Sequence, residues 1–357
     1  MQRMVVGVLW IVLSLTTSGA RADVVSATQA NTIFRSFQAA GVAAPLFNLS
    51  TTNSCAGGSI TAAPSAASID RERTVLNSNL EWFNQALSSA ATSRNRASEL
   101  AAQLTVLAQS DAFVELNWDG SGSSPAHWQL VLLRNIAMAV NLIDFQQGWG
   151  EGQRAVVVGW GNRVYDNTHY CRWGRSGSDR WPDTYAAAAS AYIYWGVATL
   201  NREAFMEGVR DFGEVVKLIE PDGSWLVFFR GQYAGVIDPT WDMSLNDKAI
   251  GDLVMAAYVA ARVGVDLFGY APDGASIYDT VVWWQDVIPT GATYGQDMSF
   301  LRPHGAERGW SWTEYFVASF PDDAATTSLR ERSAAIRSQN ANGFVGIATG
   351  PASCLIR

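Results

Sequence analysis

The chain has 357 residues, of which 48% are hydrophobic and 16% are charged. This composition supplies enough apolar material for a large core and excludes an intrinsically disordered protein. The formal net charge of -8 disfavours nucleic-acid binding, because contact with phosphates requires a basic surface.

Residues 1–22 predict a secretory signal peptide. Arg3 precedes an apolar run from Met4 to Leu15, and Ala20-Arg21-Ala22 has the small-residue pattern of a cleavage site. The run is too short to span a bilayer, and no later uncharged apolar stretch is long enough to do so. We therefore expect residues 23–357 to form a single monomeric domain in the periplasm or outside the cell, with no membrane partner.

Most of the remaining sequence has apolar residues at three- and four-residue spacing, which indicates helices, and strand-like alternation is nearly lacking. Asp70 and Ser93 are candidate N-caps for two of these helices. The other expected helices occupy Thr28 to Ala39, Trp128 to Phe145, Val156 to Tyr165, Tyr185 to Leu200, Arg202 to Ile219, Lys248 to Val263, Ile277 to Ile288, Trp312 to Phe320 and Ala325 to Gln339.

Long loops rich in Gly, Asp and Trp separate some of these helices, and the longest are expected at 171–182, 222–247 and 290–309. Antiparallel helix pairs wound into a ring place such loops at one end, over the mouth of the ring. No break in composition divides the chain into two domains. The predicted fold class is all-α, an incomplete (α/α) toroid barrel of antiparallel helix pairs.

Three cysteines, Cys55, Cys171 and Cys354, are expected in an oxidising compartment, where one pair can form a disulfide. We favour Cys55 with Cys354, which joins the two ends of the chain, and the other pairings remain open. The sequence has no C-x-x-C or H-x-x-x-H spacing, so zinc is not expected. We predict neither a metal nor a cofactor.

Aromatic residues are abundant, with 15 Trp, 11 Tyr and 15 Phe, and such side chains commonly bind the flat faces of sugar rings. The densest polar and aromatic segment is 162–185, which we expect to be a loop at one rim. Neither His127 nor His304 has comparable polar neighbours in sequence. The side chains of segment 162–185 that would converge on one ligand are Asn167, His169, Tyr170, Arg172, Trp173, Arg175 and Arg180.

A second segment, 222–248, contributes Trp225, Arg230, Tyr233 and Trp241 to the same predicted rim. Arg230 and Tyr233 are three residues apart, so they face each other only if that stretch is helical.

Five short motifs occur in a shared order over residues 156–268, with weaker support from Trp312 to Tyr315. They are Asn167-Thr168-His169, Thr199 to Phe205, Asp222-Gly223, the pair Arg230 and Tyr233, and Gly264 to Phe268. In this order they resemble the helical-barrel alginate lyases, and glucuronan lyases of similar architecture fit about as well.

The resemblance allows two registers. Counting back from Asn201 without a gap places Asp183-Thr184-Tyr185 where the family has Asn-Asn-His, whereas an insertion over 171–182 places His169 there. Counting back from Gly264 places Lys248 where the family has its catalytic Tyr.

Counting on from Asp222-Gly223 instead favours Arg230 and Tyr233 for the Arg and Tyr of the family. We prefer the registers that keep His, Arg and Tyr, because the implied chemistry uses all three. Tyr185 and Lys248 remain the alternatives.

The resemblance implies a polysaccharide lyase that cleaves a β-1,4-linked polyuronate, either polymannuronate (alginate) or glucuronan, by β-elimination to 4,5-unsaturated ends. Asn167, His169 and Arg230 would neutralise the uronate carboxylate, a role in which one donor contributes about 3 to 4 kcal/mol. Tyr233 would remove the C5 proton and return it to the leaving oxygen, or His169 would be the base and Tyr233 the acid. The expected substrate-binding residues are Tyr170, Arg172, Trp173, Arg175, Arg180, Tyr185, Trp241 and Lys248.

Two other functions compatible with the sequence involve different chemistry. One is a helical-toroid glycoside hydrolase that uses an Asp pair, such as Asp166 with Asp183 or Asp238 with Asp242. The other is a non-catalytic exported protein that binds uronan. The expected partner is a polysaccharide for all three functions. For the lyase and for the uronan-binding protein, this polysaccharide is anionic.

Overall fold

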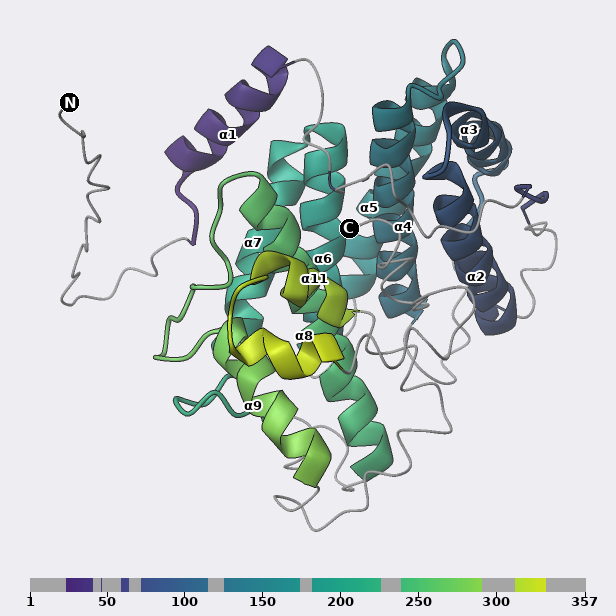
Figure 1. Ribbon diagram of the computed structural model, residues 1–357. Coiled ribbons are helices and arrows are strands. Elements are labelled where there is room, and N and C mark those ends of the chain that lie inside the picture. The colour runs from purple at the N-terminus through teal and green to yellow at the C-terminus, as the bar shows by residue number, and fades with distance from the viewer. Residues whose placement is uncertain are drawn as a thin grey trace, which may run out of the picture.

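The computed structural model describes residues 24–40, 46, 59–63, 72–114, 125–173, 182–225, 239–290 and 312–331. All regular secondary structure in these ranges is helical, which confirms the all-α class (Figure 1). The predicted signal peptide and the side chains of all three cysteines lie outside the described residues, so both the signal and the disulfide stay predictions.

The helices follow the apolar periodicity closely, and two of their N-caps are formed as local sequence dictates. Ser93 Oγ accepts a hydrogen bond from the Arg96 amide at 3.4 Å, as predicted, and Asn201 Oδ1 accepts one from Ala204 at 3.1 Å. A further short helix covers residues 325–331. The main helices are α1 (Ala27–Ala40), α2 (Glu72–Ala90), α3 (Arg94–Gln109), α4 (Pro125–Gln146), α5 (Gln153–Trp173), α6 (Pro182–Thr199), α7 (Arg202–Val216), α8 (Pro239–Arg262), α9 (Ile277–Thr290) and α11 (Thr313–Ser319).

The helices form two layers of a helical toroid. In the inner layer, α6 packs between α4 and α8, and α2 packs against the other side of α4. In the outer layer, α3, α5, α7 and α9 each pack against the inner helix that precedes them, while α1 lies against α7 and α11 against α8 (Figure 1). This arrangement confirms the predicted (α/α) toroid.

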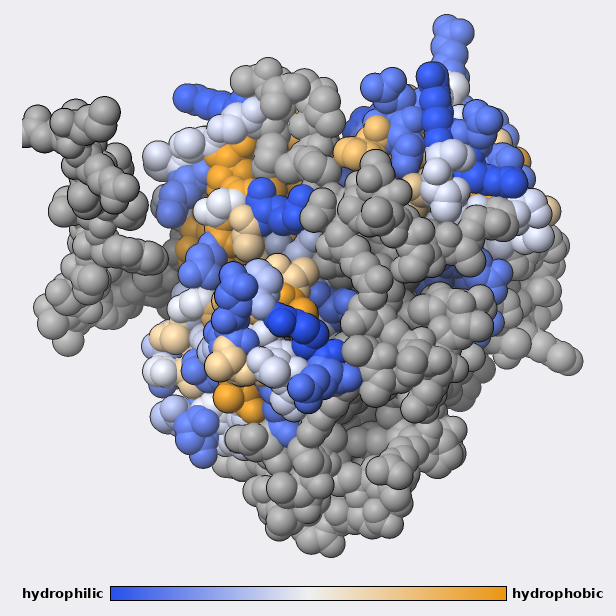
Figure 2. Space-filling model, in the orientation of Figure 1, coloured by the Kyte–Doolittle hydropathy of each residue, from blue (hydrophilic) through white to orange (hydrophobic). Residues whose placement is uncertain are grey.

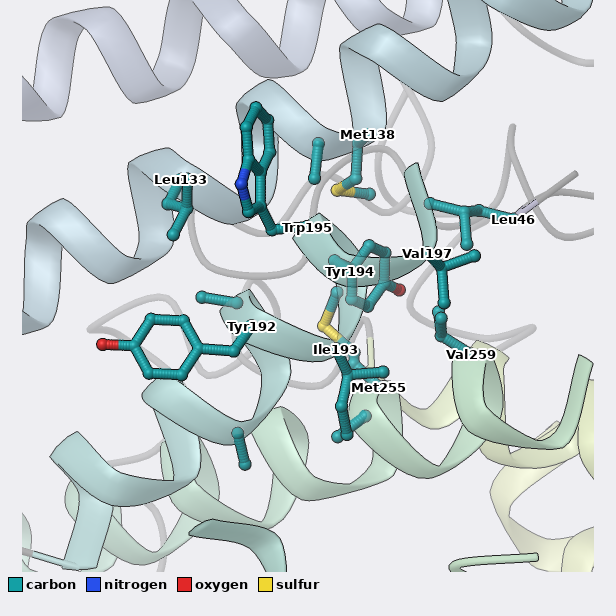
Figure 3. Close-up of a cluster of buried hydrophobic side chains, with 14 of the residues drawn as sticks. Leu46, Leu133, Met138, Tyr192, Ile193, Tyr194, Trp195, Val197, Met255 and Val259 are labelled. Atoms are coloured by element: carbon teal, nitrogen blue, oxygen red, sulfur yellow. The ribbon is translucent and has the colours of Figure 1, made fainter. Parts of the chain in front are cut away.

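The core is centred on α6, which is buried continuously from Ala186 to Ala198. Figure 3 shows why one helix can be covered on all sides: its Trp195 lies near Leu133 and Met138 of α4, while Met255 and Val259 of α8 lie near its other face. A helix that is apolar all round is stable only inside such a shell.

The inner helices α4, α6 and α8 each begin with a proline, and Pro125, Pro182 and Pro239 are equally spaced along the chain. Proline suits this first position because the amide it lacks has no partner within the helix. First-turn residues of α4 and α6 both lie within electrostatic reach of Lys248, which is about two and a half turns inside α8, so α4 and α6 begin at the same end of the barrel. The positive ends of the α4 and α6 dipoles therefore point toward one rim.

Segment 162–185 is not the rim loop that the sequence predicts, because α5 continues to Trp173 and α6 begins at Pro182. The polar residues that obscured the helical pattern bind the turn after α3 instead. Arg163 pairs with Asp111, and the Asn167 amide donates to the Val114 carbonyl.

The second predicted loop is also shorter than expected, since α8 begins at Pro239 and not at Lys248. The first turns of α8 contain Asp, Ser and Asn, which are weak helix formers, so this part of the sequence resembles a loop.

On the face shown in Figure 2, hydrophilic residues dominate the described surface over α3. None of the helices in the described ranges has the length and apolar character needed to cross a membrane.

Candidate active site

Four side chains from three inner helices meet at the rim where α4 and α6 begin: His127 and Trp128 of α4, Asp183 of α6 and Lys248 of α8. We call this group the rim cluster. Lys248 Nζ lies 5.8 Å from the centroid of the Trp128 ring, close enough for a cation–π contact. The ring of His127 meets that of Trp128 edge-on, with centroids 5.4 Å apart. The Lys248 charge also acts on His127 and Asp183, which places all four groups at one end of the barrel.

His127 is a neutral imidazole in this setting. Burial, followed by the positive charges of Lys248 and Arg134, lowers the pKa of His127 to about 3. Its Nδ1 is buried and has no hydrogen-bond partner among the described residues. An unpaired buried nitrogen costs free energy, and such costs concentrate at sites that bind or react.

Asp183 has the opposite perturbation. Burial raises the pKa of Asp183 to about 6, although the Lys248 ammonium and the backbone amide of Thr184 both favour the ionised form. The Thr184 amide donates to Asp183 Oδ1 at 2.9 Å. A carboxyl group that titrates near neutral pH can serve as either acid or base under physiological conditions.

A buried ion pair lies one layer deeper in the barrel and joins the same three helices. Arg134 Nη1 of α4 pairs with Asp252 Oδ1 of α8 and donates to Ser190 Oγ of α6 at 2.8 Å. The two charged side chains are 0% and 2% exposed. Because Asp252 is one helical turn from Lys248, this pair fixes the position of α8 relative to α4 and α6 directly beneath the rim cluster.

Asp247 anchors the same part of α8 to Trp312, the residue just before α11. The Trp312 indole donates to Asp247 Oδ1 at 3.1 Å. Loss of hydration raises the pKa of Asp247 to about 6, against the effect of that hydrogen bond and of Lys248. Two carboxyl groups with raised pKa values thus lie near the single ammonium group of the rim cluster.

Among the residues predicted from sequence, the structure describes the side chains of Asn167, Tyr185 and Lys248. Asn167 is half-buried on the face of α5 that holds the 111–114 turn, so one of its amide protons is already committed to Val114. Tyr185 lies in the first turn of α6, half-buried against the core. Only Lys248 belongs to the rim cluster.

The other predicted residues cannot be assigned a place in the site. His169, Tyr170, Arg172 and Trp173 lie on the last turns of α5, and Trp241 lies on α8, but their side chains are outside the described residues. The remaining four, which lie wholly outside the described ranges, are Arg175, Arg180, Arg230 and Tyr233. Their convergence on one ligand stays a prediction.

His127 has polar and charged neighbours in space that its sequence context does not show, because Lys248 is distant in sequence and Arg134 lies about two turns further along α4. Its position two residues after Pro125, which parallels Asp183 one residue after Pro182, is the sequence signal that could have identified it. Trp225 is fully buried and cannot act as a platform for a sugar.

A separate hollow of about 810 Å³ lies on the outer side of the barrel between α5 and α7. Asp166 lines it together with Glu203 and Glu207 and with two arginines, Arg202 and Arg210. The carboxylates outnumber the guanidinium groups, so this hollow does not favour an anionic polymer. Within the described ranges, no three His, Cys, Asp or Glu side chains are arranged to hold a metal ion.

Apart from Asn167-Thr168, which lie within α5, the described motifs of the family resemblance form turns and caps. Asn201 caps α7, and Gly223 and Gly264 both have φ of +82°, a conformation that glycine adopts without strain. A Cβ at Gly223 would also lie 3.0 Å from the Asp279 carbonyl oxygen. The shared order of these motifs therefore reports the fold more directly than the chemistry.

Comparison with known proteins agrees with this fold. The structure is similar to alginate lyase A1-III from Sphingomonas species A1, with a TM-score of 0.61, 17% identity, and coverage of 91% of this chain and 93% of that one. Two variants of alginate lyase A1-III complexed with tetrasaccharide give TM-scores of 0.60 and 0.58 at 18% identity, and cover 91% and 87% of this chain. No protein-family model matches the sequence, and no curated protein matches it.

Proposed function

We propose that this protein is an exported polysaccharide lyase that cleaves a β-1,4-linked polyuronate by β-elimination. The observation that carries the proposal is the rim cluster, where an ammonium group of α8, an aromatic ring and a carboxyl group of raised pKa meet at the positive ends of α4 and α6. The likeness of the whole barrel to alginate lyase A1-III supports the same conclusion at the level of the fold.

The chemistry requires each of these groups. The C5 proton of a uronate is weakly acidic, and charge flows into the adjacent carboxylate as that proton departs. A fixed positive charge at the carboxylate stabilises this transition state. A base must take the proton and an acid must protonate the oxygen that leaves C4.

Which residues fill these roles depends on the register of the family resemblance. In the register preferred from sequence, Asn167, His169 and Arg230 neutralise the carboxylate and Tyr233 transfers the proton. In the other register, these tasks fall to residues near Asp183, Tyr185 and Lys248.

The hydrolase function receives less support. One of its two candidate pairs joins Asp166 with Asp183, but Asp166 lines the outer hollow between α5 and α7, while Asp183 belongs to the rim cluster. The side chains of the other pair, Asp238 and Asp242, lie outside the described residues. A glycosidase needs both carboxyl groups on either side of one bond.

The direct test incubates the purified chain, without residues 1–22, with polymannuronate, polyguluronate and glucuronan. Ultraviolet absorbance of the conjugated 4,5-unsaturated end should rise with one of the two β-linked polymers. New reducing ends without absorbance would show hydrolysis, and binding without either change would show a non-catalytic uronan-binding protein. Either outcome would refute the proposed elimination.

A further inference from the structure

Lys248 is a cation without a counterion among the described residues. Lys248 lies within electrostatic reach of Asp183, Asp247 and Asp252, yet none of these carboxylates forms an ion pair with Nζ. The deeper carboxylate, Asp252, is instead occupied by Arg134. The ammonium group is therefore positioned to bind a carboxylate that the described part of the protein does not itself supply.

Trp128 gives this cation a specific setting. Its ring holds Nζ at 5.8 Å, and the adjacent His127 packs edge-on against the ring, so the indole has a fixed orientation. A sugar ring can lie on an indole face while its carboxylate reaches a neighbouring ammonium group. The partly exposed Trp128 and Lys248 together match a single uronate residue.

We propose that Lys248 binds and neutralises the carboxylate of the uronate being cleaved and that Asp183 is the base for its C5 proton. This inference rests on the proposed function and selects the ungapped register, in which Lys248 occupies the place of the family's Tyr. His127 is neutral and buried, and it supports the Trp128 ring edge-on from behind the sugar.

The elimination balances with these groups alone. The Asp183 carboxylate takes the C5 proton, and the C5–H electron pair becomes the C4=C5 double bond. The C4–O bond breaks with its pair on the glycosidic oxygen, which receives a proton from Asp183 or from water. Lys248 stays protonated throughout and stabilises the charge on the C6 carboxylate.

The pH dependence of this step is set by the charges around Asp183. Lys248 of α8 favours its ionised form, Asp252 of the same helix opposes it, and Arg134 of α4 neutralises Asp252. Activity should rise as the pH passes through about 6, because the base must be ionised.

Lysine labelling gives a test that does not depend on turnover, because Lys217 and Lys248 are the only lysines in the sequence. Lys217 pairs with Glu214 at 2.8 Å on the surface and is the internal control. The full mature chain is acetylated briefly with and without polymannuronate or glucuronan oligomers, and the modified peptides are quantified by mass spectrometry. We expect uronate oligomers to reduce labelling of Lys248 at least fivefold and to leave Lys217 unchanged, and neutral mannan oligomers to protect neither.

Variants then separate the two roles. Lys248→Met should raise KM and lower kcat/KM by about 10²- to 10³-fold, the range seen when one charge-stabilising donor is removed. Lys248→Arg should recover part of this loss, and Lys217→Met should remain within twofold of wild type. Asp183→Asn should lower kcat with little change in KM and abolish the rising limb of the pH profile.

The outcomes distinguish this inference from the proposed function. If the wild type releases unsaturated products but Lys248 is not protected, or if Tyr233→Phe is inactive while Lys248→Met and Asp183→Asn are active, the inference is overturned and the lyase function stands. Protection of Lys248 in a chain that cleaves no uronan would support the carboxylate contact and refute the elimination. Neither protection nor cleavage would overturn both.

Discussion

Replacement of Asp252 by Asn tests whether the deep ion pair organises the inner helices. The Arg134 guanidinium is 0% exposed and pairs with the Asp252 carboxylate, so the variant removes a negative charge from beside a buried cation. Breaking one partner of such a pair typically costs about 3–5 kcal/mol. For a chain of this size, that corresponds to a fall in Tm of roughly 4–7 °C.

Thermal and urea unfolding followed by circular dichroism measure this effect. A matched control is Glu214→Gln, which breaks the exposed pair with Lys217 and should change stability by less than about 0.5 kcal/mol. The double variant Arg134→Met with Asp252→Leu removes both charges and should recover most of the loss. A change below about 1 kcal/mol in Asp252→Asn, or no recovery in the double variant, would refute the reasoning.

Four further variants test other parts of the structure. The pKa of Asp183 is about 6 in the folded state and 3.8 in the unfolded state, so the free energy of unfolding falls as the pH rises from about 4 to 6. Asp183→Asn should remove roughly 3 kcal/mol of this fall, which unfolding measured at pH 4 and pH 7.5 would reveal. In α5, a Cβ at Gly161 would overlap the Trp195 indole, so Gly161→Ala should destabilise the protein by more than about 2 kcal/mol in urea unfolding. A Cβ at Gly159 meets nothing closer than 3.9 Å, so Gly159→Ala should stabilise the protein by about 0.5–1 kcal/mol. Trp160→Phe removes the donor to the Ala112 carbonyl and should cost about 1–3 kcal/mol, and equal stability of the two proteins would contradict that role.

The helices could be predicted from sequence wherever one face is apolar. In α7 and α9, apolar residues recur at helical spacing, and the predicted ends lie within three residues of the observed ones. The prediction failed where polar side chains serve tertiary contacts. The second half of α5 holds the 111–114 turn through Arg163 and Asn167, so its sequence lacks the apolar stripe on which the prediction depends.

The site was harder to predict for a different physical reason. Local density of polar residues favoured segment 162–185, but the rim cluster takes one or two residues from each of three helices separated by long connections. His127, Asp183 and Lys248 come together only because α4 and α6 begin at the same end of the barrel, beside the third turn of α8. The family register predicts Lys248 as a substrate-binding residue, whereas its own neighbours in sequence give no such indication.

The free-energy cost of burying ionisable groups on the inner helices also indicates where the functional site lies. Desolvation raises the pKa of Asp183 and Asp252 and lowers that of His127, so each of these groups is less stable in its charged form than in water. Apolar residues of similar size would fill the same space without this cost, as they do in the rest of α6. A protein retains such groups together when the site gains from their proton affinities, and the position of His127 and Asp183 at the positive ends of α4 and α6 favours a negatively charged substrate.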